Sequence, residues 1–151
     1  MRMQAGMGVA TAVLLLLAGC DRGGVRPAQA CPPDDRPGSQ LVVVHVWLDG
    51  AADAPDIRVR EPACRIAPGA RLHWVAVGPR ASRLDAIVFK RASASAAGES
   101  RLRAGDAGGR RAVPTTARRD LGEATAFEYA VYAGASVLDP VVIIDPALRT
   151  R

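Results

Sequence analysis

The chain has 151 residues, with 20 basic and 15 acidic side chains and a formal net charge of +5 at pH 7. A basic balance can indicate a nucleic-acid partner, but aromatic residues make up only 4% of the sequence, and none interleaves the arginines between Arg91 and Arg119. We therefore expect no nucleic acid among its partners. Nucleophile-elbow, His-Glu-x-x-His and phosphate-loop motifs are missing as well, so we expect no enzyme and no catalytic residue.

Residues 1–19 have the pattern of a secretory signal peptide. Arg2 gives a positive start, an apolar run peaks at Val13–Leu17, and small residues follow. The uncharged stretch Ala5–Gly19 has 15 residues. A membrane-spanning helix needs roughly 18 to 20. A transmembrane helix that stays attached is the alternative, and it fits this length poorly.

The segment Leu17-Ala18-Gly19-Cys20 resembles the lipobox of bacterial lipoproteins. That resemblance implies cleavage before Cys20 and attachment of acyl groups such as palmitate to this residue. Acylated Cys20 would then hold the mature chain in the lipid bilayer, on the periplasmic face of the cell membrane. Asp21 directly after it is similar to a signal for retention in the inner membrane. The alternative is that Asp21 simply begins a polar tether.

Residues 20–40 are rich in proline and glycine, which predicts a flexible tether between the lipid and a folded domain at 41–148. Within that domain, residues 91–119 hold seven arginines and almost no large apolar side chain. Burial of such a segment cannot offset its ordering entropy, so we expect a disordered basic insertion. A solvated insertion is the simpler interpretation, and contact with anionic lipid head groups is the functional alternative.

Two cysteines remain after Cys20, namely Cys31 and Cys64. In an oxidising compartment we expect them to form a disulfide, which the chain-entropy estimate values at about 3 to 4 kcal/mol. The bridge would also fix where the tether leaves the domain. A thiolate metal site is the alternative, and no Cys-x-x-Cys or His-x-x-Cys spacing supports it.

After residue 40, apolar and polar residues alternate with a period of two and show no sustained helical stripe. The predicted strands are Leu41–Leu48, Ile57–Arg60, Ala70–Val77, Ala86–Lys90, Ala126–Tyr132 and Val137–Asp145. Glycine and proline separate these strands, and no helix intervenes. The pattern predicts an all-β fold, a small antiparallel Greek-key-type β-sandwich, with Trp47 and Trp74 in its core.

Two parts of this pattern carry a family resemblance. The run Pro68-Gly69-Ala70-Arg71-Leu72-His73-Trp74 is similar to a strand of the cupredoxin-like family. Phe127-Glu128-Tyr129-Ala130-Val131 and Val141-Val142-Ile143-Ile144 are similar to the last two strands of that family. The resemblance covers roughly residues 41–145 and implies a cupredoxin-like sandwich within the wider immunoglobulin-like class.

The copper chemistry of that family is not expected here. A blue-copper site takes two histidines, one cysteine and usually an axial methionine. Val131 stands where the family places its cysteine, and Gly134 stands near its histidine. The three methionines, Met1, Met3 and Met7, all lie in the predicted signal peptide. We therefore expect no type 1 copper and no other cofactor.

His45 and His73 are the two histidines of the chain, and both fall on predicted strands. If these strands are neighbours, the imidazoles could face each other and bind zinc or cupric ion with help from Asp49 or Asp85. Two histidines without a nearby third ligand make a weak site. We expect ordinary sheet histidines and no bound metal.

These features predict a lipoprotein of the cell envelope whose sandwich binds another protein or a small ligand without catalysis. The contact surface would be an exposed edge strand or the arginine-rich segment. Metal handling by His45 and His73 is the alternative function. A hydrolase is a third, although nothing places a serine beside either histidine. The serines available for it are Ser82, Ser93, Ser95 and Ser136.

Overall fold

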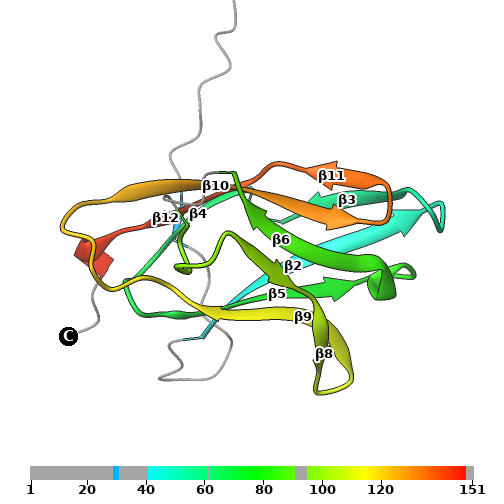
Figure 1. The fold of residues 1–151 in the computed structure, drawn as a ribbon, viewed down its shortest axis with the longest axis horizontal. Coiled ribbons are helices and arrows are strands. Elements are labelled where there is room, and N and C mark those ends of the chain that lie inside the picture. Colours follow the sequence, from blue (N-terminus) through cyan, green and yellow to red (C-terminus); the bar gives the residue numbers. More distant parts are fainter. Residues whose placement is uncertain (1–28, 31–40, 61, 91–94, 149–151) are drawn as a thin grey trace, which may run out of the picture.

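A computed structural model describes residues 29–30, 41–60, 62–90 and 95–148. Most of this part is built from β-strands, and two sheets pack face to face (Figure 1). One layer contains β10, β11 and β12, and the other contains β2, β5 and β9. The expected all-β sandwich is confirmed.

The first sheet has seven strands in the order β1-β4-β12-β10-β6-β7, with β11 paired to β10. Its strands are Gln29–Ala30 (β1), Ala63–Ile66 (β4), Leu84–Phe89 (β6), Arg101–Arg103 (β7), Thr125–Ala133 (β10), Ser136–Leu138 (β11) and Val141–Ile144 (β12). The second sheet has five strands in the order β3-β2-β5-β9-β8. Its strands are Leu41–Gly50 (β2), Pro55–Val59 (β3), Arg71–Val77 (β5), Gly105–Ala107 (β8) and Arg110–Thr116 (β9). Short 3-10 helices follow β5 and β12, at Ala81–Arg83 (η1) and Pro146–Leu148 (η3).

Both sheets are mixed, although most strand pairs are antiparallel as expected. β2 pairs in parallel with β5, and β4 pairs in parallel with both β1 and β12. Parallel neighbours need a crossover between them. β3 and β4 form that crossover between β2 and β5, and the chain changes sheets between these two strands. The parallel pair brings the two histidine-bearing strands side by side.

Alternation along β2 and β5 fixes the core. One face of these strands buries Val42, Val44, Val46 and Leu48 from β2 and Leu72, Trp74 and Ala76 from β5. Trp74 is fully buried, as expected, and packs edge-on against Phe89 and Tyr129 of the opposite sheet. The ring centroids lie 6.4 and 5.4 Å away, which is the favoured range for such pairs. This aromatic cluster joins the two layers.

The polar atoms of this cluster are shut off from water. Burial raises the pKa of the Tyr129 phenol to about 12, and the neighbouring indole N–H of Trp74 offsets part of that rise. The same N–H has no acceptor in hydrogen-bonding geometry; among the described residues, Trp74 Nε1 is the buried side-chain polar atom left without a partner. The phenol and the indole are therefore in electrostatic contact but too poorly aligned for a hydrogen bond.

The basic segment 91–119 was predicted wrongly. Residues 91–94 lie outside the described part, but 101–116 form β7, β8 and β9 instead of a disordered insertion. β9 pairs with β5 over five residues, and its Val113 is fully buried. Ala104 alone separates β7, at the edge of one sheet, from β8, at the edge of the other. The segment thus closes one side of the sandwich.

Small side chains explain why the composition of this segment led to a wrong prediction of disorder. Ala96, Ala112 and Ala117 are each only 2% exposed, although none of them buries much area. Backbone pairing with β5 and β6 supplies the hydrogen bonds that an isolated segment would lack. Arg111 Nε also donates a 3.0 Å hydrogen bond to the Leu84 carbonyl across the sandwich. Strand formation here depends on tertiary neighbours more than on local composition.

The predicted strand Val137–Asp145 divides into β11 and β12 at the Asp139-Pro140 step. Its first part folds back on β10 and lies against β3 (Figure 1). Gly134 in that turn has a φ of +56°, and a Cβ there would come 2.4 Å from the Asp53 carbonyl oxygen. Only glycine allows this approach of the turn to the β2–β3 loop.

Val113→Ala should lower the free energy of unfolding by about 2 kcal/mol, because it removes two buried methyl groups and leaves a cavity. Thr116→Ala on the same strand is the matched control. Thr116 is exposed, so its loss should change stability by no more than about 0.5 kcal/mol. Urea unfolding followed by circular dichroism measures both. Equal, negligible effects would contradict the placement of β9 in the core.

Candidate functional site

The predicted lipid and disulfide positions fall largely outside the described residues. Cys20, Asp21 and Cys31 all lie there, so lipid attachment, sorting and the Cys31–Cys64 bridge stay predictions. Cys64 itself is buried in β4, and Gln29 of β1 pairs directly with it. Of the part that the structure describes, no helix has the length and apolar character that a bilayer crossing requires.

His45 and His73 lie on one face of the five-stranded sheet. Val43 pairs with His73 and His45 pairs with Val75, so the two histidines are diagonal neighbours on adjacent strands. Both are half-buried. Diagonal side chains on a sheet stand about 7–8 Å apart. The condition that the two strands be neighbours is met.

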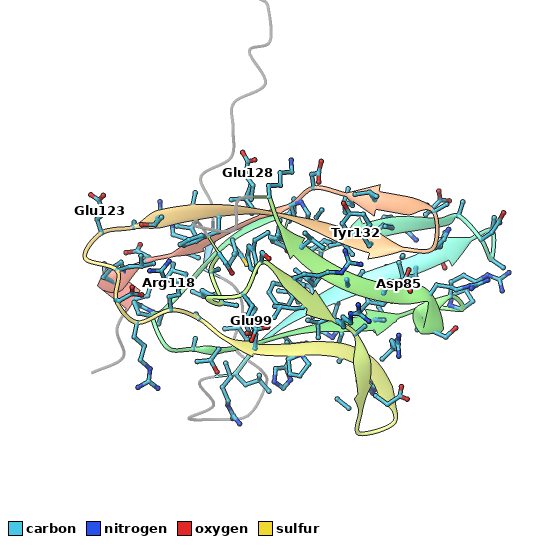
Figure 2. The ribbon with its side chains drawn as sticks, viewed as in Figure 1. Asp85, Glu99, Arg118, Glu123, Glu128 and Tyr132 are labelled. Carbon is cyan, nitrogen blue, oxygen red and sulfur yellow. The ribbon has the colours of Figure 1, made fainter. Side chains whose placement is uncertain are left out.

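The carboxylates considered as a third ligand lie elsewhere. Asp49 forms an ion pair with Arg58, and it lies four residues beyond His45 on β2, which is about 13 Å of strand. Asp85 lies on β6 of the other sheet, near η1, where it accepts a 2.8 Å hydrogen bond from the Gly134 N–H (Figure 2). Within the described ranges, no three His, Cys, Asp or Glu side chains gather as a metal site.

The face that carries both histidines is turned away from the core, and we call it the outer face. Strand alternation and cross-strand register assign its members. They are Val43, His45, Trp47 and Asp49 of β2, Asp56 and Arg58 of β3 with Arg60 after it, Arg71, His73, Val75 and Val77 of β5, and Arg110, Ala112, Pro114 and Thr116 of β9. The centre of the outer face is apolar and its rim is charged.

Trp47 was expected in the core, and this expectation is wrong. Its side chain is 46% exposed, whereas Trp74 is fully buried. Its cross-strand neighbours are Arg58 of β3 and Val77 of β5. A pocket of about 310 Å³ lies beside the indole and is lined by Trp47, Arg58, Val59 and Arg60. A large apolar ring exposed next to arginines is typical of a binding surface.

Charge on the outer face is predominantly positive. Its four arginines stand against two aspartates, Asp49 and Asp56, and Asp49 is already paired with Arg58. Arg58 and Arg60 flank the pocket, while Arg71 lies at the opposite end of the sheet from Trp47. The charge is therefore spread around the apolar centre.

Several other cations also have partners. Arg118 donates to Asp120 at 2.9 Å and lowers the pKa of that carboxyl to about 2. Other partnerships are Lys90 with Asp139 at 3.2 Å and with Glu128 at 3.8 Å, Arg65 with Asp145 at 3.0 Å, and Arg101 over the Tyr132 ring at 5.8 Å. Figure 2 shows Glu128 directed away from the sandwich on the seven-stranded sheet. Arg83, Arg103 and Arg119 are also exposed, so positive charge is present outside the outer face, and the outer face is distinguished by the exposed indole of Trp47.

The candidate serines do not lie on the sheet that carries the histidines. Ser82 is in η1 and Ser136 is in β11, while Ser93 is outside the described residues. Ser95 is buried before β7; its hydroxyl donates to the Glu99 carbonyl and accepts from the Ala97 N–H. These local bonds account for the burial of the Ser95 hydroxyl.

The sequence does contain a signal for the position of Trp47. The even-numbered residues from Val42 to Leu48 are all aliphatic, while the odd-numbered set contains His45 as well as Trp47. A two-residue period requires one set to face the core and the other to face away. Trp47 therefore lies on the same face of the strand as His45, away from the core. Its arginine neighbours depend on the pairing of β2 with β3, which no local pattern reveals.

Comparison with models of known protein families gives no match to this chain, and comparison with curated proteins gives none either. The outer face is therefore interpreted from its own chemistry.

Titration with zinc or cupric ion should give no binding in the micromolar range, since no third ligand accompanies His45 and His73 in the described part. Isothermal calorimetry of the full chain measures this. His73→Ala should leave the titration unchanged, with Trp47→Phe as a control that keeps both histidines. Micromolar affinity that disappears in His73→Ala would contradict the expectation.

Proposed function

We propose that this chain is a lipoprotein of the cell envelope, anchored through acylated Cys20, whose β-sandwich binds a partner through the outer face without catalysis. The observation that carries the binding role is Trp47, which is 46% exposed beside Arg58 and Arg60, whereas Trp74, Phe89 and Tyr129 fill the core. Solvated indole surface is costly to leave uncovered. A partner that covers Trp47 would recover that free energy.

The anchor follows from the lipobox resemblance at Cys20. It places the sandwich at the periplasmic face, and Asp21 favours the inner membrane. The proposed bridge between Cys31 and Cys64 belongs to the same compartment. It is supported by the pairing of β1 with β4, because Gln29 lies opposite Cys64 and Cys31 is only two residues further along the chain.

We also propose that the sandwich is cupredoxin-like and has no type 1 copper. The motifs that carry the resemblance lie in β5 and in the antiparallel pair β10–β12. Val131 is fully buried in β10, and Gly134 donates its N–H to Asp85. Neither residue offers a copper ligand at the position where the family would place one.

Metal handling remains the alternative function, and the shared face of His45 and His73 is the observation that favours it. The two imidazoles lie on β2 and β5, which are neighbouring strands of the sheet. They could take part in a metal site that a partner molecule completes. The outer face would then supply two ligands and not a binding platform.

Intact mass spectrometry of the protein extracted from membranes tests the anchor. The expected mass is that of residues 20–151 plus acyl groups, with a gain of about 2 Da on reduction for the two hydrogens added to one disulfide. Cys20→Ser should abolish the acyl mass and release the chain from membranes. An unprocessed, unacylated wild-type chain would overturn the proposed localisation.

Photo-crosslinking from the outer face tests the binding role. A photoreactive amino acid in place of Trp47 should capture a partner in intact cells, because this position is exposed at the centre of the proposed surface. The same amino acid in place of Glu128, which is exposed on the other sheet, is the matched control. Equal capture patterns from the two positions would contradict a role for the outer face.

A further inference from the structure

The outer face combines three properties that together restrict its occupant. Among the described residues no second layer covers this face of the sheet, and the face has half-buried aliphatic residues at its centre and carries an exposed indole. The central aliphatic residues are Val43, Val75 and Val77. Its rim is basic. These features suit a partner that has a broad, negatively charged surface with an apolar layer beneath it.

The charge disfavours a symmetric contact between two copies through this face. Such a contact would bring Arg58, Arg60, Arg71 and Arg110 against their own equivalents, and the described acidic residues of the face are Asp49 and Asp56. Like charges placed opposite each other across an interface are unfavourable by several-fold or more in affinity. An anionic partner complements the same residues.

Tryptophan and arginine are the side chains that suit the boundary between lipid head groups and acyl chains. The indole has an apolar body and a polar N–H, and this gives tryptophan its preference for that boundary. Each basic side chain near an anionic bilayer strengthens attachment about fivefold. A bilayer surface also matches the breadth of a sheet face.

The length of the tether allows the outer face to reach the bilayer. Nine residues, 20–28, separate the lipidated cysteine from β1, and extended chain of that length spans about 30 Å. β1 lies at the edge of the seven-stranded sheet, and the two packed sheets are only about 10 Å apart. A tether of that length is long enough for the anchor to reach the plane of the outer face. Tethering makes this contact intramolecular, so a weak surface suffices.

We propose that the outer face docks on the anionic phospholipid head groups of the bilayer that holds Cys20. Trp47 enters the interface, and Arg58, Arg60 and Arg71 contact lipid phosphates. The proposal rests on the proposed lipid anchor. It differs from the expectation of a mobile basic loop, because the docking residues lie on β2, β3 and β5 and not in the segment 91–119.

Fluorescence quenching in reconstituted vesicles tests this docking. The acylated full chain, purified from membranes, is placed in phosphatidylcholine vesicles with or without about 30 mol% phosphatidylglycerol, both containing acyl-brominated lipid. Trp74 is fully buried, so its emission is a constant background. The Trp47→Phe variant measures the emission of Trp74 alone. Trp47 emission should be quenched in the anionic vesicles and recover in high salt.

Substitutions on the rim supply the matched comparison. Arg60→Ala and Arg71→Ala should each lower the ratio of docked to undocked protein about fivefold in anionic vesicles. Arg103→Ala should leave it unchanged, because Arg103 is exposed on β7 of the other sheet. Circular dichroism of each variant should match wild type.

Three results would overturn the proposal. Unquenched Trp47 in chains that sediment with the vesicles would show that the face stays in solvent, and equal quenching in neutral vesicles would remove the head-group contact. Protection of Trp47 from acrylamide by soluble polyglutamate but not by vesicles would assign the face to an acidic polypeptide. Failure to sediment, with an unacylated mass, would instead overturn the anchor itself and the docking that depends on it.

Discussion

The parallel pairing of β2 with β5 is the constraint on which the rest of the molecule depends. Its inner face supplies the apolar floor of the core, from Val42 to Leu48 and from Leu72 to Ala76. Its register sets which residues of these two strands are neighbours on the outer face, including Val43 beside His73 and Trp47 beside Val77. A slip of one residue would turn the valines outward and bury the histidine and the exposed indole. Core stability and the composition of the outer face are thus set by the same register.

The arginine-rich segment completes the sandwich. β9 extends the five-stranded sheet beside β5, and Ala104 carries the chain from β7 in one sheet to β8 in the other. Arg111 reaches across to the Leu84 carbonyl, and Ala104 donates its N–H to the Asp85 carbonyl at 2.8 Å. Strands that change sheets cover an open side that would otherwise expose the core and unpaired backbone groups. Arginine in this segment therefore acts in part as a structural side chain.

The two surfaces of the sandwich differ in their exposed side chains. On the seven-stranded sheet, Lys90 and Arg65 lie within 4 Å of carboxylates, Arg101 lies over the Tyr132 ring, and Arg103 is exposed. On the outer face, arginines surround an apolar centre and Trp47 is left exposed. The buried cluster of Trp74, Phe89 and Tyr129 fills the space between the sheets and holds both surfaces in place.

The sequence by itself determined the two-residue period and the strands from Leu41, Ala70 and Ala126 onward, because alternation is a local property of the backbone. It also determined the supply of candidate metal ligands, two histidines and three cysteines, because ligand identity needs no structure. Tertiary structure decided that residues 101–116 are strands, that β2 and β5 are neighbours, and that arginines flank Trp47. These features depend on which distant segments pair and in which register, and the hydrogen bonds and buried area that select a pairing exist only between segments far apart in the chain.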